Sequence, residues 1–409
     1  MRFSAQPNSQ PPLAQAQSNA QAANAKADLA LAQSNAISAK ISKPTISKPL
    51  EWAANTTVSG RMFFNASRVT HEVNGVTTGN PDNGGGVAIK RMYLGVDHKF
   101  NDTFFASVTM DADNVAGTTN NLVGKGFYIK KAYLQAKVDP ALIVELGAAD
   151  LPWLPYVESI YGYRHIEKTL ADRTSYGTTA DWGLHALGSL AGGAVSYQIS
   201  AIDGAGYRDV HFSRTIDLEA RVSAKYKGFN LALGGYTGKL GKNLVAASGA
   251  PLSLRTYSRF DALAAFQGNL SENLPFTLGV EYLYAWNKAL NLVAPIAKSD
   301  PADSSEGYSV FASASPVQHW SVFGKYERLT PSRNVLPTIK DDYYNLGIQW
   351  SPARIVDLAL VYKHDQASNG ALSLGDLQSG VIGCSTTAST ACSGKGTYDE
   401  FGLFGQFRF

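Results

Sequence analysis

From residue 56 onward, apolar and polar residues alternate in segments of about ten residues, and no long helical periodicity interrupts them. In 216–226, the even-numbered positions are Ile, Leu, Ala, Val, Ala and Tyr, whereas the odd-numbered positions carry Asp, Glu, Arg, Ser and Lys. The segments 276–284 and 356–363 alternate in the same way. Because successive side chains of a strand point to opposite faces of a sheet, each segment predicts a strand with one face more apolar than the other.

The connections between these strands alternate between short and long. Short connections lie near 99–102, 139–140, 191–193, 227–228, 268–273, 315–317 and 351–353. Long connections lie near 69–85, 112–124, 149–181, 204–213, 239–254, 287–304, 329–341 and 365–396. A soluble β-sandwich also has alternating strands, but its turns are of mixed length. Tight turns on one side and long loops on the other are typical of a transmembrane β-barrel.

We therefore predict an all-β fold, a transmembrane antiparallel β-barrel of about 16 strands with both termini on the periplasmic side. The barrel must close, because lipid cannot satisfy the hydrogen-bonding groups of an open sheet edge.

Aromatic residues at the strand ends support this prediction. The last segment, 401–409, alternates and ends on Phe409, and bacterial outer-membrane barrels resemble it closely, since a terminal aromatic strand is what their insertion machinery recognises. Trp286, Trp320 and Trp350 stand at predicted strand ends, where aromatic girdles meet the membrane interfaces. The alternative interpretation is that these aromatics belong to an ordinary core. We expect a bacterial outer-membrane location, with membrane lipid and lipopolysaccharide as partners.

Composition narrows the class of protein further. The chain is 44% hydrophobic and only 17% charged, which excludes disorder for most of its length. No stretch approaches the roughly 20 unbroken apolar residues that a spanning helix needs. The net charge of +3 excludes a strongly basic nucleic-acid binder, so no nucleic-acid partner is expected.

The first fifty residues differ from the rest, and we divide the chain into 1–50 and a barrel over 51–409. No apolar segment follows Met1, so no signal peptide is visible, and the barrel pattern favours a processed chain over an intracellular one. The Ala/Gln-rich stretch 13–41 carries a thin heptad pattern, which indicates either a periplasmic oligomerisation helix or a disordered tether. In the alternative function, an envelope-tethering structural protein, this segment would contact peptidoglycan.

A barrel of this size leaves an aqueous lumen, so its default function is passive diffusion of small hydrophilic solutes. The third long connection, 149–181, is the one with enough length and apolar content to fold inward. Its apolar residues include Leu151, Trp153 and Tyr161. Because so apolar a loop should not stand in solvent, we expect it to pack inside and narrow the pore.

Four segments resemble the phosphate-selective porin O/P family of Gram-negative outer membranes. They are 146–153, 163–173, Lys-Arg-Met-Tyr-Leu-Gly-Val at 90–96 and Lys-Ala-Tyr-Leu-Gln at 131–135. The resemblance implies a sixteen-stranded homotrimeric porin constricted by its third loop. It implies arginine ladders and a lysine cluster only for the phosphate-specific members. Asp150 stands where the family commonly has Lys, which argues against tight phosphate binding.

Charged residues predict the constriction itself. Basic and acidic residues are nearly equal on the predicted inward faces, which favours a transverse field of opposed charges over an all-positive funnel. We predict constriction charges at Arg164, Lys168, Arg173, Arg61, Arg91, Lys131, Asp150 and Glu158. Alternatively, Arg164 and Arg173 pair with Glu158, Glu167 or Asp172 and hold the fold of the loop.

Other motifs add little chemistry. Cys384 and Cys392 fall in the last outer loop, where an oxidising surface predicts a disulfide. We expect no cofactor and no metal, because the calcium-like segment from Asp111 lacks the Gly and terminal Glu of a binding loop. An outer-membrane hydrolase is the remaining alternative, with His364–Asp365 as its one suggestive pair. We predict a channel and not an enzyme.

Overall fold

The protein is described here from a computed structural model, which describes residues 52–79, 83–113, 127–210, 213–242, 249, 251–290, 295–374, 381–385 and 391–409. The chain divides into two units, Met1–Asn55 and Thr56–Phe409. In the first unit, residues 52–55 form one turn in which the Asn55 N–H donates to the Trp52 carbonyl at 3.2 Å. The helix, tether and peptidoglycan predictions for 1–50 lie outside the described residues.

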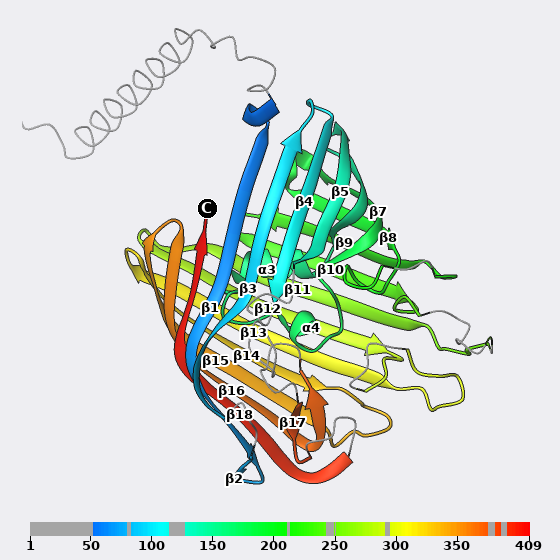
Figure 1. Cartoon of the computed structure of the whole chain (residues 1–409), viewed down its shortest axis with the longest axis vertical. Coiled ribbons are helices and arrows are strands. Elements are labelled where there is room, and N and C mark those ends of the chain that lie inside the picture. Colours follow the sequence, from blue (N-terminus) through cyan, green and yellow to red (C-terminus); the bar gives the residue numbers. More distant parts are fainter. Residues whose placement is uncertain are drawn as a thin grey trace, which may run out of the picture. The chain divides into compact units, whose positions relative to one another are not determined.

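Sixteen long strands and two short ones form one sheet in the described part of the second unit (Figure 1). The long strands are β1 (Thr56–Val73), β3 (Gly84–Lys99), β4 (Phe104–Asp113), β5 (Tyr128–Asp139), β6 (Leu142–Asp150), β7 (Ala180–Leu190), β8 (Val195–Ile202), β9 (Asp217–Tyr226), β10 (Phe229–Gly238), β11 (Tyr257–Ser271), β12 (Leu274–Trp286), β13 (Ser304–Val317), β14 (Trp320–Thr330), β15 (Lys340–Ala353), β16 (Val356–Ser373) and β18 (Ala391–Arg408). The short strands are β2 (Val76–Thr77) and β17 (Val381–Gly383), and the helices are α3 (Leu154–Tyr161), α4 (Leu170–Arg173) and the 3₁₀ turn η1 (Ala191–Gly193).

The sheet closes on itself. Each long strand pairs antiparallel with the next one, and β1 pairs with β18 from Arg61↔Arg408 to Val73↔Gly396, so no long strand is left with a free edge (Figure 1). The connections alternate between short turns and long loops as predicted. Within the described residues, no helix has the length and apolarity required to cross a bilayer. The fold is therefore the predicted closed barrel of sixteen antiparallel strands.

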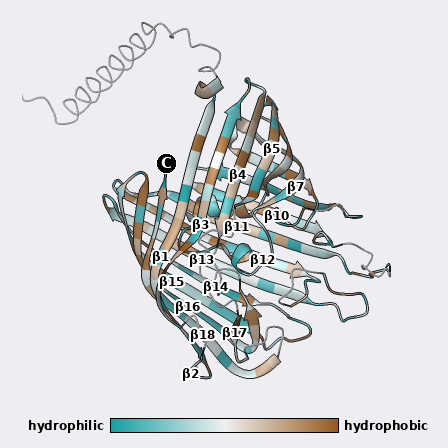
Figure 2. Ribbon diagram, in the orientation of Figure 1, coloured by the Kyte–Doolittle hydropathy of each residue, from teal (hydrophilic) through white to brown (hydrophobic). Residues whose placement is uncertain are grey.

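The two faces of the sheet have the polarity expected for a transmembrane barrel. Along β9, Asp217, Glu219 and Arg221 are buried and the apolar positions between them are exposed, so that Glu219 is 1% exposed and Leu218 is 48% exposed. Teal and brown positions alternate along the other strands as well (Figure 2). In a single closed sheet, the buried face is the inside. The alternation in 216–226, 276–284 and 356–363 therefore placed the side chains on the correct faces.

Several strands extend further than the sequence predicts at the end where the long loops lie. The pairing between β16 and β18 continues to Gly370↔Ala391, whereas we expected a loop from 365 onward. Most of these residues are polar or small, so the regular apolar alternation ends before the hydrogen-bonded ladder does. Arg255 precedes β11, and its guanidinium donates to the Asp300 carbonyl at 2.8 Å.

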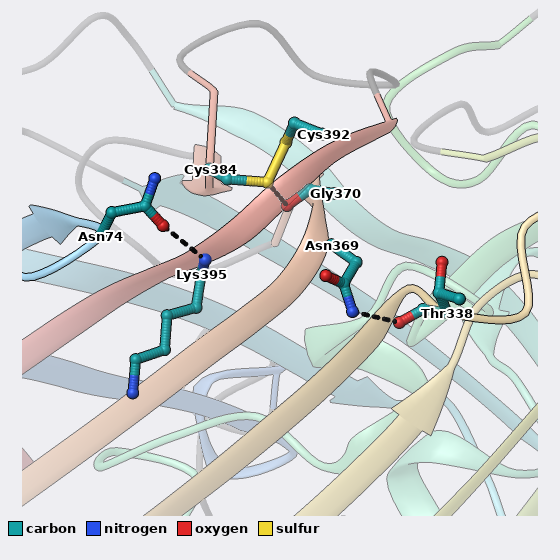
Figure 3. The surroundings of a disulfide bond; sticks show 7 residues. All are labelled: Asn74, Thr338, Asn369, Gly370, Cys384, Cys392 and Lys395. Carbon is teal, nitrogen blue, oxygen red and sulfur yellow. Dashed lines mark hydrogen bonds between the residues drawn. A yellow bond between two sulfur atoms is a disulfide. The ribbon is translucent and has the colours of Figure 1, made fainter.

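The predicted disulfide is present and lies among contacts between the long connections. Cys384 and Cys392 are bonded, with their Cα atoms 5.9 Å apart (Figure 3). Close by, the Lys395 N–H donates to the Asn74 side chain at 2.9 Å, and the Asn369 amide donates to the Thr338 carbonyl at 3.1 Å (Figure 3). Strands β17 and β18 also contribute to a buried apolar cluster, which consists of Val69, Ile339, Leu372, Ile382 and Tyr398. The disulfide thus tethers β17 to β18 beside this cluster.

Leu360 tests whether the exposed apolar face meets lipid. It is exposed on β16, opposite Ile348 of β15 and Leu403 of β18. We expect Leu360→Arg to destabilise the barrel by about 2–4 kcal/mol, because it moves a charge into hydrocarbon. Leu360→Ala is the control and should lose clearly less. Urea unfolding in lipid vesicles measures both, and equal losses would show that this face does not contact the bilayer core.

Candidate functional site

The third long connection, 151–179, packs against inward-facing side chains. Trp153 precedes α3 and is fully buried, and its indole N–H donates to Glu281 of β12 at 3.0 Å. The Tyr161 ring at the end of α3 meets Phe311 of β13 edge-on, with the centroids 5.3 Å apart. Gly162 then ends the helix at φ 80°, a left-handed conformation that glycine adopts without steric penalty. These contacts join the connection to the β9–β14 side of the wall.

Arg173, at the end of α4, is the most strongly held charge of this connection. Its guanidinium pairs with Glu327 at 2.5 Å, Asp341 at 2.6 Å and Asp365 at 2.8 Å, and it is 1% exposed. Burial opposes the charged form, but the three carboxylates together raise the pKa of Arg173 above its ordinary value. The interaction pins α4 to strands β14, β15 and β16.

Other cations attach the same connection to the same wall. Arg259 of β11 pairs with Asp261 at 2.7 Å and donates to the Tyr176 carbonyl at 2.6 Å. Lys325 of β14 pairs with Glu327 at 2.8 Å and donates to the Lys168 carbonyl. Many carboxylates on this side of the barrel are therefore neutralised by cations that also hold the connection.

The opposite wall carries two pairs of consecutive basic residues, and a β-bulge turns each pair inward. The register with β1 passes from Phe63↔Arg91 to Phe64↔Ile89, so Lys90 is the extra residue. Its ammonium donates to the Ile166 carbonyl at 2.7 Å, while Arg91 pairs with Asp111 at 2.5 Å. Because a bulge inserts one residue, neighbouring side chains share a face.

The second bulge lies on β5. The register with β4 passes from Thr109↔Lys131 to Met110↔Ile129, so Lys130 is the extra residue. The Lys130 ammonium lies 4.8 Å from the Tyr93 ring centroid, and Lys131 pairs with Asp150 at 2.5 Å. Strict alternation predicts only Arg91 and Lys131 inside. The missed signal was the doublet itself, because a regular strand would place one of two adjacent cations in lipid.

A cavity of about 1050 Å³ lies between the third connection and this basic wall. It reaches the end of the barrel that carries the short turns, where Arg354 and Phe409 line it. Six basic and two acidic side chains line it: Arg61, Lys130, Lys131, Arg164, Arg354, Arg408, Asp150 and Glu158. Water therefore meets predominantly positive charge along this side.

The structure brings together five of the eight residues predicted at the constriction. Those that line the cavity are Arg61, Lys131, Asp150, Glu158 and Arg164. Arg91, Lys168 and Arg173 are buried in ion pairs elsewhere. The sequence did not predict Lys130, Arg354 or Arg408 at this site. Arg354 lies in the short turn between β15 and β16, and Arg408, the last residue of β18, donates to its carbonyl at 2.9 Å.

Arg164 and Glu158 form a pair on the cavity side of the connection. The guanidinium contacts Glu158 at 2.7 Å and Asp172 at 3.4 Å. Burial raises the pKa of Glu158, which Arg164 opposes. The pairing alternative thus holds for Arg164, whereas Arg173 finds its carboxylates on the barrel wall instead.

Metal and hydrolytic chemistry find no support in the described residues. No group of three or more His, Cys, Asp and Glu side chains there is arranged to hold a metal ion, and the calcium-like segment continues into 114–126, outside those residues. His364 contacts Asp399 at 2.8 Å, while Asp365 lies on the other face of β16 and holds Arg173. The predicted His364–Asp365 pair therefore does not act as one unit.

Removing Arg173 should release the third connection. Arg173→Ala leaves three buried carboxylates without their shared cation, and we expect a loss of about 3–5 kcal/mol in the free energy of unfolding. Arg333→Ala is the control, since Arg333 pairs with Glu306 at 3.3 Å on the exposed surface and should lose about 0–1 kcal/mol. Urea unfolding followed by tryptophan fluorescence measures both. Equal losses would contradict the anchoring role.

His165 should make stability depend on pH. Its ring is buried between Tyr163 and Phe63, and burial lowers the pKa of His165 to about 3. The unfolded chain, with a pKa near 6.5, therefore takes up the proton first as the pH falls. Stability from neutral His165 is complete above about pH 6.5 and is lost as the pH falls towards 3.

Between pH 6 and pH 5, the wild-type protein should lose about 1.2 kcal/mol more than His165→Gln. Urea unfolding at the two pH values measures the difference. The exposed His319→Gln serves as the control and should keep the wild-type pH dependence. A wild-type slope in His165→Gln would mean that the ring is not buried in its neutral form.

Comparison with known proteins places the fold. No family model and no curated protein matches the chain. The anion-selective porin from Comamonas acidovorans is 13% identical, with 87% of this chain and 99% of that chain covered and a TM-score of 0.60. The trimer form of OmpT, an outer membrane protein of Vibrio cholerae, is 12% identical over 87% and 99%, with a TM-score of 0.54. The outer membrane channel DcaP of Acinetobacter baumannii is 12% identical over 87% and 97%, with a TM-score of 0.52. At these identities the similarity shows the fold alone, that of bacterial outer-membrane porins and channels, and the resemblance to the phosphate-selective O/P family stays a prediction.

Proposed function

We propose that the protein is a passive channel of the bacterial outer membrane for small hydrophilic solutes, with a preference for anions. The observation that carries the proposal is the cavity of about 1050 Å³, which is lined by six basic and two acidic side chains inside a barrel with an apolar outer face. Solutes would pass between the third connection and the wall formed by β1, β3, β5 and β18. The fold shared with outer-membrane porins and channels supports the location and the reaction class, which is diffusion without catalysis.

The anion preference follows from how charge is divided between the two sides of the lumen. On one side, Glu327, Asp341 and Asp365 are buried with Arg173 and lie away from the cavity. On the other side, Arg61 and Arg354 are exposed. Lys131, Arg164 and Arg408 are partly exposed beside their carboxylate partners. Fixed positive charge beside an aqueous path raises the local anion concentration and lowers that of cations.

We do not extend the proposal to tight phosphate binding. Lys131 is paired with Asp150, and the two side chains remain 24% and 42% exposed. A passing anion must compete with this carboxylate, which weakens any single binding step. The proposed channel is therefore mildly selective. For the phosphate-specific members of the O/P family, the resemblance implies arginine ladders and a lysine cluster instead.

A homotrimer is part of the proposal. The trimer form of Vibrio cholerae OmpT shares this fold, and identical subunits usually close with cyclic symmetry. The proposed surroundings are outer-membrane lipid and lipopolysaccharide, with both termini periplasmic.

Reversal potential in a KCl gradient across a planar bilayer tests the selectivity. We expect the sign that reports chloride preference for the wild-type channel. Lys131→Gln should shift the potential towards cations, because it removes one positive charge and leaves Asp150 without its partner. Arg61→Gln also removes one positive charge from the cavity lining and should shift the potential in the same direction.

Arg328→Gln is the matched control for Arg61→Gln. Arg328 pairs with Asp342 on the outward face at 3.4 Å, so its loss should leave the potential unchanged. Cation preference in the wild-type channel, or equal shifts in all three variants, would remove the basic wall from the mechanism.

A further inference from the structure

A second, smaller cavity of about 230 Å³ lies where the third connection leaves β6. The polar and charged side chains that line it are Tyr133, Glu145, Asp150, Tyr156, Gln198 and Arg221. They come from strands β5, β6, β8 and β9 and from α3, so the barrel wall forms one side and the connection covers the other. A pocket this size suits only a small solute.

Glu145 is a buried carboxylate that lines this pocket, and the nearest cation, Lys131, does not form an ion pair with it. Glu145 is 7% exposed, and the described residues provide it with no hydrogen bond and no ion pair. Its cross-strand neighbour His185 contacts Ser200 at 2.9 Å and the Gly147 carbonyl at 3.3 Å instead. Burial of an ionised carboxylate is unfavourable unless something pairs with it.

Arg221 is the matching cation in the same pocket, and it too has no carboxylate partner in the described part of the chain. It is 9% exposed, donates to the Pro152 carbonyl at 2.8 Å, and contacts the hydroxyls of Ser196 and Ser223. Its guanidinium lies 4.1 Å from the Tyr156 ring centroid. These neutral contacts fix its orientation but leave its charge uncompensated. The remaining acid, Asp150, is already held by Lys131.

Two buried opposite charges thus face one pocket and do not reach each other. A ligand with one charge would satisfy one group and leave the other buried and unpaired. A small zwitterion would satisfy both, because an ammonium donates to a carboxylate and a guanidinium binds a carboxylate through two parallel hydrogen bonds.

We propose that this pocket binds a small zwitterion with its ammonium group at Glu145 and its carboxylate at Arg221. Amino acids and short amino carboxylates belong to this chemical class. The site stands beside the solute path but does not depend on the ion preference of the channel. Failure of this site would therefore leave the proposed channel function intact. Failure of the proposed ion preference would leave this site intact.

Isothermal titration calorimetry on the full chain in detergent tests the site. The probes are glycine, β-alanine and 4-aminobutyrate, with propionate and propylamine as ligands that carry one charge each. We expect at least one zwitterion to bind saturably, and at least tenfold more tightly than either singly charged ligand. Glu145→Gln should weaken that binding at least tenfold while the thermal unfolding temperature stays close to wild type.

Asp97→Asn is the matched control, since Asp97 is an inward-facing acid on β3 outside this pocket. It should bind the zwitterion like the wild type. The proposal is overturned by the absence of zwitterion binding, by unchanged binding in a folded Glu145→Gln, by equal binding of propylamine, or by an equal loss in Asp97→Asn. Because calorimetry measures no current, none of these outcomes bears on the chloride preference.

Discussion

In the hydrocarbon of a bilayer no water is available to backbone N–H and C=O groups, so each of them needs a partner within the protein. A sheet meets this requirement only if it closes, and β1 and β18 complete the ring here. Closure in turn fixes two faces of opposite polarity, with Leu218 outside and Glu219 inside on the same strand. Charges on the inward face, such as Glu219, are thereby directed into one confined space.

The third connection divides that space unequally. Its apolar side chains, including Trp153 and Tyr161, cover the wall from β9 to β14, and Arg173 extends the attachment to β16 through three carboxylates. This arrangement buries acidic groups on one side and leaves accessible cations on the other. Arg173, one of the residues predicted at the constriction, therefore acts as an anchor, and the three acids that it neutralises lie away from the cavity.

Backbone irregularity adds to the same asymmetry. Two bulges turn Lys90 and Lys130 inward beside Arg91 and Lys131. A regular strand would face one member of each doublet towards lipid, at about 2–4 kcal/mol. The bulges avoid this penalty and double the number of cations that two strands bring to the lumen. The small pocket near Glu145 shows the opposite situation, in which buried charges are left for a solute to satisfy.

The sequence by itself determined the closed antiparallel barrel, the faces of its strands, the alternation of turns and loops, and the disulfide, because all of these depend on local periodicity or on neighbouring residues. It located the end of each strand less well, since the ladder between β16 and β18 continues through residues that are mostly polar or small. It named Arg61, Lys131, Asp150, Glu158 and Arg164, which do share a cavity. It could not separate Arg164 from Arg173, because both lie in the same segment, 163–173. Only the tertiary structure decided which cations meet water, because that depends on carboxylates more than 150 residues away on strands that the closed barrel brings against the loop.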